Sequence, residues 1–216
     1  MLTPPVVLLT GFEPFGGDTV NPSALAVQAL AGRHLHGHHV VSAQLPVAFG
    51  AALGAMQQLL GSHRPALVIT VGQAGGRAAI SLERVAINVD DARIADNSGA
   101  QPVDRPVVVG GPDAYFSTLP IKAMRAALLA AGIPAEVSQT AGTFVCNHVF
   151  YGLMHELAGN TQLAGTRGGC IHVPWLPEQG TPALALPQTI DAIALAVRTA
   201  LAHTGDDLAL AAGATH

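Results

Sequence analysis

Short runs of apolar, β-branched residues alternate along the chain with longer segments in which apolar residues recur every three or four positions. The short runs have the length and composition of buried strands, and the longer segments have the period of amphipathic helices. This pattern predicts strands at residues 6–10, 40–45, 67–71, 82–89, 135–139 and 169–173, and helices at 22–30, 48–60, 119–131, 146–157 and 188–202. Strands that alternate with helices are typical of a parallel sheet covered by helices, so the predicted fold class is α/β.

One segment interrupts this alternation. Between residues 79 and 109, two extended stretches flank a polar loop at 97–104, with no helical period between them. This pattern predicts a protruding β-hairpin whose loop could cover a site. We expect residues 1–205 to form a single domain, because no linker or repeat divides them, and residues 206–216 to fray, because they lack a core pattern.

Composition restricts the class of protein and its partners. The chain has 216 residues, 50% of them hydrophobic and 11% charged, so it can bury a core without disulfides or a structural metal. Its net charge of −4, with ten Lys and Arg, provides no basic stripe for nucleic acid or an anionic membrane. A small or neutral ligand fits this composition better.

The sequence shows no recognisable export signal, and no apolar run approaches the roughly 20 residues of a membrane helix. We therefore expect a cytoplasmic protein in which Cys146 and Cys170 are free thiols.

Cys146 is the first candidate for chemistry. The apolar stripe of the helix that follows extends back to it, so a buried core cysteine is one interpretation. Cys146 also lies in the first turn of that helix, where the helix dipole and free backbone N–H groups favour a thiolate and can bind an oxyanion. Cys170, in the interior of a predicted strand, is the rival nucleophile but has no helix terminus beside it.

His172 and Glu83 complete a possible catalytic set. His172 ends a predicted strand before Pro174, at the edge where open α/β sheets place their ligands, although a satisfied core histidine is the alternative. Glu83 opens an alternating apolar stretch that ends at Val89, which places its carboxylate on the inward face. Two interpretations of Glu83 remain open. It is either a catalytic acid or one half of a structural ion pair with Arg77, Arg84 or Arg93. A Cys, a His and an acid are the ingredients of a thiol acyl-transfer triad.

Five segments resemble the pyroglutamyl peptidase I family, also called pyrrolidone carboxyl peptidases. They are GFEPFGG at 11–17, VGQAGGR at 71–77, ERVAINVDDARI at 83–94, GTFVCN at 142–147 and HVPWLP at 172–177. The resemblance covers about residues 6 to 200 in order, which is far more specific than a lone Cys and His. It implies a cysteine omega-peptidase that releases pyroglutamate from peptide N-termini through a thioester. It also implies an α/β/α sandwich with a mostly parallel, mixed sheet.

The same resemblance implies roles for individual residues. Cys146 would be the nucleophile, His172 the general base and acid, and Glu83 the group that orients the histidine, with Arg93 near the oxyanion. The residues implied around the substrate ring are Phe12, Phe15, Gln73, Ile94, Phe144 and Val145. No metal or cofactor is implied, and the implied assembly is a cytosolic homotetramer, or a dimer. Two Phe in one Gly-rich turn also suit the apolar walls that a neutral lactam ring needs.

Three other classes of protein remain open. A nucleoside phosphorylase-like transferase would suit the layered fold and the Gly-rich turn at 72–77, but it leaves the Cys, His and Glu unexplained. A nucleotide-binding module would use the same turn, although no P-loop Lys-Ser/Thr follows it. A metal hydrolase is suggested by four clustered histidines without an accompanying acid, which we interpret as a solvated turn: His34, His36, His38 and His39.

Overall fold

The structure is a computed structural model that describes residues 4–213. A seven-stranded sheet forms its centre, in the order β2-β3-β1-β4-β9-β5-β8. The strands are β1 (Val6–Phe12), β2 (His34–Leu35), β3 (His38–Leu45), β4 (Leu67–Gln73), β5 (Ile80–Glu83), β8 (Ala135–Ser138) and β9 (Arg167–Val173). Strands β3, β1, β4 and β9 are parallel, whereas β5 runs antiparallel to β9. The predicted mixed, mostly parallel sheet is therefore confirmed.

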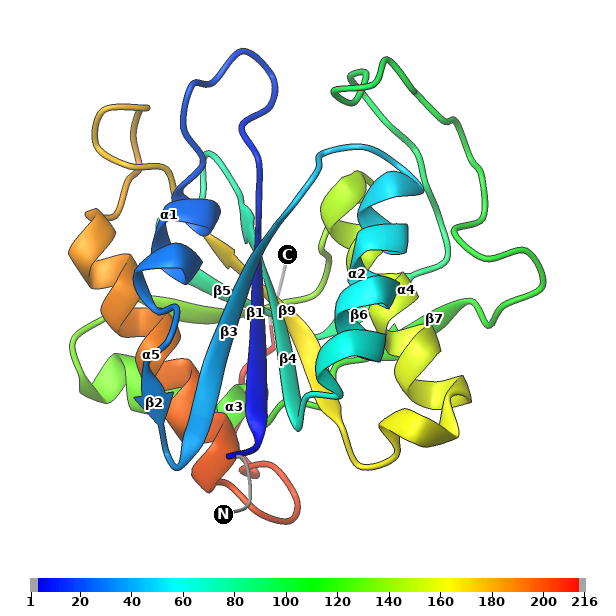
Figure 1. Cartoon of the computed structure of the whole chain (residues 1–216). Helices are drawn as coiled ribbons and strands as arrows, with labels where there is room; N and C mark the ends of the chain where they lie inside the picture. Colours follow the sequence, from blue (N-terminus) through cyan, green and yellow to red (C-terminus); the bar gives the residue numbers. More distant parts are fainter. Residues whose placement is uncertain (1–3, 214–216) are drawn as a thin grey trace.

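Helices cover both faces of the sheet (Figure 1). On one side lie α1 (Pro22–Ala29), α3 (Ile121–Ala130) and α5 (Leu186–Ala202), and on the other α2 (Ala51–His63) and α4 (Val145–Gly159). Successive residues of a strand face opposite sides of a sheet, so each central strand contributes to two hydrophobic cores. Leu9 and Ile171 belong to one core, and their neighbours Leu8 and Cys170 belong to the other. The result is the α/β/α sandwich that the family resemblance implied.

Capping explains where two of the helices begin. At α1, the Asn21 side chain accepts a hydrogen bond from the Ser23 N–H at 3.0 Å, and Pro22 is the first helical residue, as expected. Helix α2 begins three positions later than predicted, at Ala51. The N–H of Phe49 donates instead to the Asp96 carboxylate at 2.8 Å, which holds the preceding residues in a loop.

The segment at 79–109 differs from the predicted hairpin. The predicted strand at 82–89 is divided into β5 and β6 (Val85–Ile87), and β6 pairs antiparallel with β7 (Ala114–Phe116) in a separate small sheet. The division occurs at Arg84, whose N–H still donates to Ser138 of β8 while its C=O accepts from Ser117. A small antiparallel sheet is therefore present, but its second strand lies beyond the predicted segment. Residues 88–113, which we name the arm, are green in Figure 1 and extend at the sheet end where β1 and β9 finish.

Residues 203–213, which follow α5, have no regular structure, but Asp207 is held by two hydrogen bonds. Its two carboxylate oxygens accept hydrogen bonds from the N–H groups of Lys122 and Ala123, at 2.8 and 2.9 Å. The residue before α3, Pro120, provides no side-chain cap, so Asp207 caps this helix from a distant part of the sequence. The predicted domain boundary at residue 206 stays a prediction. Within residues 4–213, no helix is both long enough and apolar enough to span a bilayer.

Candidate active site

The sheet brings His172 and Glu83 together beneath α4. Ser81 of β5 lies opposite His172 of β9 in the antiparallel pair, so Glu83, two residues further, shares the face of His172 as its diagonal neighbour. The Nδ1 atom of His172 lies 2.7 Å from Oε1 of Glu83, and both side chains are buried. The inward orientation expected for Glu83 is thus present.

Cys146 reaches the same histidine from above the sheet. It is the second residue of α4, and the strand beneath it carries Gly72, which pairs with His172 across β4 and β9. A Cβ added to Gly72 would lie 2.8 Å from Sγ of Cys146 and 2.8 Å from Cδ2 of His172. The thiol and the imidazole therefore meet over Gly72, in space that a larger residue would occupy.

The interactions around His172 and Glu83 favour the charged forms of these two side chains. Burial of the His172 imidazole acts to lower its pKa, but the interactions with Cys146 and Glu83 outweigh burial and raise this pKa to about 9. Burial acts to raise the pKa of Glu83, but its hydrogen bond and charge interaction with His172, helped by Arg77, hold it below the usual value. At neutral pH a carboxylate therefore supports an imidazolium that faces the thiol.

The other cysteine lies in a different environment. Burial, and then the charge of Glu83, raise the pKa of Cys170 well above its usual range, so this thiol stays protonated at neutral pH. A protonated, fully buried thiol is a poor nucleophile. Cys146, at a helix start and partly exposed, is better placed to react.

The ion pair considered for Glu83 is present, with Arg77 as its partner. Nη1 of Arg77 donates to Oε1 of Glu83 at 2.7 Å, so this carboxylate is in an ion pair and also holds the histidine. The other two arginines considered as partners lie elsewhere. Arg84 donates to Gln139 at 2.9 Å, and Arg93 is exposed at the rim of a pocket.

That pocket lies at the residues that precede α4 and has a volume of about 210 Å³. Its lining residues are Phe15, Asp91, Arg93, Ile94, Thr143 and Phe144. Four of them, Phe15, Arg93, Ile94 and Phe144, are predicted site residues. Phe12 and Val145 are instead buried in the core. The Gln73 amide is bonded to Asp18 and Gln179, at 2.8 and 3.2 Å.

Sequence reasoning missed residues that support this pocket. The ring of Phe49 lies edge-on to Phe144, with centroids 5.5 Å apart, and edge-on to His148 at 5.4 Å. His148 is fixed in turn, because its Nδ1 lies 2.8 Å from Asp90 and its Nε2 accepts from the Gly50 N–H at 3.1 Å. These partners lie far apart in the sequence, so periodicity gives no signal for them.

Asn147, directly after Cys146, was also missed. Its Oδ1 accepts from the N–H of Ile87 at 3.0 Å, and its Nδ2 donates to the carbonyls of Ile87 and Val89 at 2.9 and 3.0 Å. The buried amide thus acts as a short strand partner for β6. It fixes the first turn of α4 against the start of the arm.

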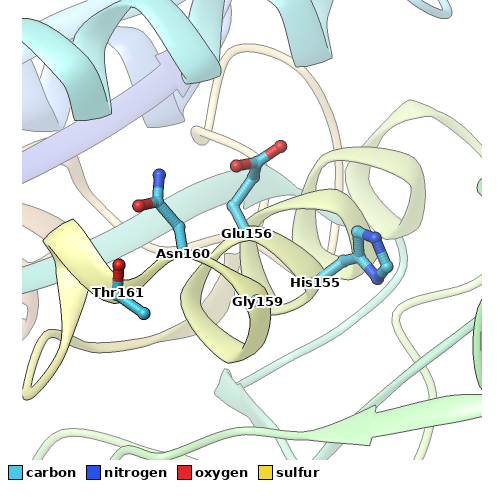
Figure 2. Close-up of a pocket in the computed structure, with 5 residues that line it drawn as sticks. All are labelled: His155, Glu156, Gly159, Asn160 and Thr161. Atoms are coloured by element: carbon cyan, nitrogen blue, oxygen red, sulfur yellow. The ribbon is translucent and has the colours of Figure 1, made fainter.

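A larger pocket, of about 380 Å³, lies at the opposite end of α4 (Figure 2). It is lined by His155, Glu156, Gly159, Asn160 and Thr161. Its nearest residue, His155, lies nine positions after Cys146 along the helix, which corresponds to about 13 Å. It contains neither a cysteine nor the paired His and carboxylate of the other site, so we do not assign the chemistry to it.

The clustered histidines form the β2–β3 turn. His34 and His39 face each other across the strand pair with ring centroids 5.2 Å apart. Within residues 4–213, no group of three or more His, Cys, Asp or Glu side chains is arranged to hold a metal ion.

Comparison with known proteins agrees with this geometry. Residues 6–203 match the model of the family described as pyroglutamyl peptidase. The pyrrolidone-carboxylate peptidase of Cupriavidus taiwanensis is 61% identical over 208 residues, covering 94% of this chain and 95% of the relative. That of Klebsiella pneumoniae is 57% identical, covering 97% of this chain and 99% of the relative.

Solved structures give the same result. The pyroglutamyl peptidase I of Bacillus amyloliquefaciens superimposes with a TM-score of 0.93 at 47% identity, over 97% of this chain and 100% of that one. The pyrrolidone carboxyl peptidase of Thermococcus litoralis gives a TM-score of 0.92 at 35% identity, over 96% of this chain and 99% of that one. On the strength of a match that spans nearly its whole length, this chain belongs to the pyroglutamyl peptidase family of cysteine peptidases.

Proposed function

We propose that this peptidase hydrolyses the bond after an N-terminal pyroglutamyl residue and releases free pyroglutamate, with Cys146, His172 and Glu83 as its triad. The observation that carries this proposal is the buried 2.7 Å contact of His172 with Glu83, with the Cys146 thiol on the other side of the imidazole. Relatives that are 50–61% identical are named pyrrolidone-carboxylate peptidases. The nucleoside phosphorylase-like alternative has no support from these relatives.

The proposed reaction is acyl transfer in two steps. The Cys146 thiolate attacks the pyroglutamyl carbonyl, and backbone N–H groups at the start of α4, with Arg93, stabilise the oxyanion. His172 donates its proton to the leaving amine, which leaves a thioester on Cys146. Water, deprotonated by the now neutral His172, then hydrolyses the thioester. Glu83 accepts the hydrogen bond from Nδ1 throughout and so directs Nε2 toward the reacting atoms.

The 210 Å³ pocket supports the proposed substrate. Its walls include Phe15, Ile94 and Phe144, and the Phe15 and Phe144 ring centroids lie 5.9 Å apart. A neutral lactam ring can enter such walls without losing the hydration of a charge. An N-terminal Glu or Pro would bring an ammonium group into the same space and should be rejected.

The experiment that tests this proposal compares amides of pyroglutamate, glutamate and proline. We expect release from the pyroglutamyl amide only, abolished in Cys146→Ser and largely retained in Cys170→Ser. Equal rates on the prolyl amide would contradict the specificity. Alkylation by iodoacetamide at Cys170, with an active Cys146→Ser enzyme, would contradict the nucleophile.

We also propose a cytoplasmic homotetramer or dimer that needs no metal or cofactor. Support for self-association comes from apolar side chains near the arm: Val109 is 87% exposed, Val103 64%, and Phe116, on β7, 68%. We infer that these side chains contribute to an apolar patch of the kind that marks protein interfaces. Full activity in the presence of a chelator is the expected result for the metal-free proposal.

A further inference from the structure

We propose that Arg77 is a positioning residue of this active site, which holds one oxygen of Glu83 toward His172 and ties this carboxylate to the loop that leads to Cys146. The inference rests on the proposed triad and adds a fourth member that does not touch the substrate.

The contacts of the guanidinium carry the argument. Nη1 of Arg77 donates to Oε1 of Glu83 at 2.7 Å and to Oγ of Ser138 at 3.3 Å. Nη2 donates to the carbonyl of Thr140 at 3.1 Å. The planar fork of an arginine suits this kind of two-sided contact, whereas an ammonium group is a single point of charge. One side chain therefore joins the triad acid to two residues of the chain just before α4.

The arrangement around Glu83 explains why a second donor matters. Oε1 receives both Arg77 and His172, while Oε2 is buried without a hydrogen-bond partner. With His172 alone, rotation of the carboxylate away from the imidazole would break one charge-assisted hydrogen bond. With Arg77 present as well, the same rotation would break two. Arg77 therefore helps to hold the carboxylate in the position that faces the imidazole.

The positive charge of Arg77 also favours the ionised form of Glu83. The groups that face Glu83 are His172 and Cys170 of β9, Ser138 of β8 and Arg77, with Cys146 beyond the imidazole. A buried carboxylate tends to take up a proton unless cations lie beside it. Arg77 is the cation that remains when His172 passes its proton to the leaving group. It therefore helps Glu83 to stay ionised during the step in which the imidazole is neutral.

The Thr140 contact links the acid to the nucleophile. Thr140 accepts through its carbonyl from Arg77 and from Oγ of Ser138, and its own Oγ1 accepts from the N–H of Gly142. Gly142 lies four residues before Cys146 in a turn with a φ of +77°. Movement of Arg77 would therefore disturb the support of both ends of the triad.

The test compares Arg77→Met and Arg77→Lys with the control Arg84→Met, whose arginine lies beside Glu83 in sequence but bonds Gln139. For Arg77→Met we expect kcat to fall about 10- to 100-fold with KM within about twofold, and the acid limb of kcat/KM to move up by about half a pH unit or more. Arg77→Lys keeps the positive charge, so the acid limb of its kcat/KM profile should lie at the wild-type pH, whereas its kcat should lie between those of Arg77→Met and the wild type. Arg84→Met should match the wild type.

Alkylation of Cys146 by iodoacetamide, followed against pH, gives a readout that needs no peptide substrate. We expect its acid limb to move up in Arg77→Met, so the inference can be judged even if the pyroglutamyl amide is not cleaved. Wild-type kcat and unshifted acid limbs in a folded Arg77→Met enzyme, or wild-type kcat in a folded Arg77→Lys enzyme, with only thermal stability lowered in either case, would overturn the positioning role. Such a result would leave a structural ion pair and would not affect the proposed triad.

Discussion

Gly72 lies where β4 passes beneath the thiol and the imidazole, and it is the residue at which one added methyl group would test the site most directly. Its Cβ would be 2.8 Å from both Cys146 Sγ and His172 Cδ2, closer than van der Waals contact allows. One of the two side chains must then move. The family motif contains this glycine, but its place beneath Cys146 and beside His172 depends on the pairing of β4 with β9.

We predict that Gly72→Ala lowers kcat/KM about 100-fold, because displacing a reacting group by about 1 Å costs that much. Circular dichroism should show an unchanged fold. Gly61→Ala, in α2 with no atom within 4 Å of the added Cβ, is the matched control and should keep full activity. A fully active Gly72→Ala enzyme would mean that the thiol and imidazole do not need the contact seen here.

The substitution Glu83→Gln tests whether the negative charge of this side chain is needed for catalysis, because it changes the charge and keeps the size. The amide keeps the size of the side chain but no longer stabilises the imidazolium, so we predict a fall in the acylation rate of at least about tenfold, or about 1.4 kcal/mol. His172→Ala should lose more. Pre-steady-state amine release measures this step. Unchanged kinetics with a lower Tm would instead assign Glu83 a structural role alone.

The His172–Glu83 pair also predicts a pH dependence of stability. His172 has its pKa raised from 6.5 to about 9, so its contribution is complete below pH 6.5 and is lost as the pH rises through 9. Glu83 has its pKa lowered from 4.5, so its contribution is present above pH 4.5 and lost below its folded-state pKa. We therefore expect His172→Gln to lower Tm most between pH 4.5 and 6.5 and least above about pH 9. A pH-independent difference in Tm would contradict this coupling.

Among the elements, the five helices and five of the six predicted strands could be predicted from the sequence, whereas β2, β7 and the division of the stretch at 82–89 into β5 and β6 could not. Each predicted helix is present within three residues of its expected start, because an amphipathic stripe extends over many positions. The sequence pattern at 82–89 predicts one continuous strand. In the structure, the N–H of Arg84 donates to Ser138 of the main sheet, but its carbonyl accepts from the N–H of Ser117, and the chain leaves the main sheet at this residue. This change of partner depends on Ser117, which lies more than thirty residues later. A local pattern of apolar and polar residues gives no signal for so distant a hydrogen-bond partner.

Asp207 gives a prediction for α3. Asp207→Ala removes the cap from two N–H groups, so the free energy of unfolding should fall by about 1 to 2 kcal/mol. Urea denaturation measures the change. Asp206→Ala, its neighbour, whose side chain makes no hydrogen bond to the residues described here, is the control and should leave stability nearly unchanged. Equal effects of the two substitutions would show that the Asp207 cap contributes nothing.

For the whole molecule, the family motifs supply most of the candidate site, and the fold supplies its geometry. The motifs point to Cys146, His172 and Glu83, whereas no motif shows that Glu83 lies diagonal to His172 across an antiparallel strand pair. The supports of the pocket, such as Phe49 and His148, depend on contacts between distant loops. Their roles, like those of the triad, stay predictions until variants are measured.

The proposed assembly predicts a mass in solution. Light scattering should give about four, or two, times the 22.0 kDa of one chain. Val109→Asp combined with Phe116→Ser should reduce this mass, because both groups are exposed in one chain and a charge there would oppose apolar contact. Leu129→Ser, on α3, is the control and should not change the mass. A wild-type mass of 22.0 kDa would refute the assembly.

The position of β9 has a consequence for synthesis of the protein. Among residues 4–213 it is the last strand to leave the ribosome, yet it lies between β4 and β5 in the middle of the sheet. Until it arrives, β4 and β5 each have an open edge that β9 later covers, and open edges invite pairing with other chains. The same strand delivers His172. A chain that ends before β9 therefore lacks the proposed general base, and we expect peptidase activity to appear only when this strand has joined the sheet.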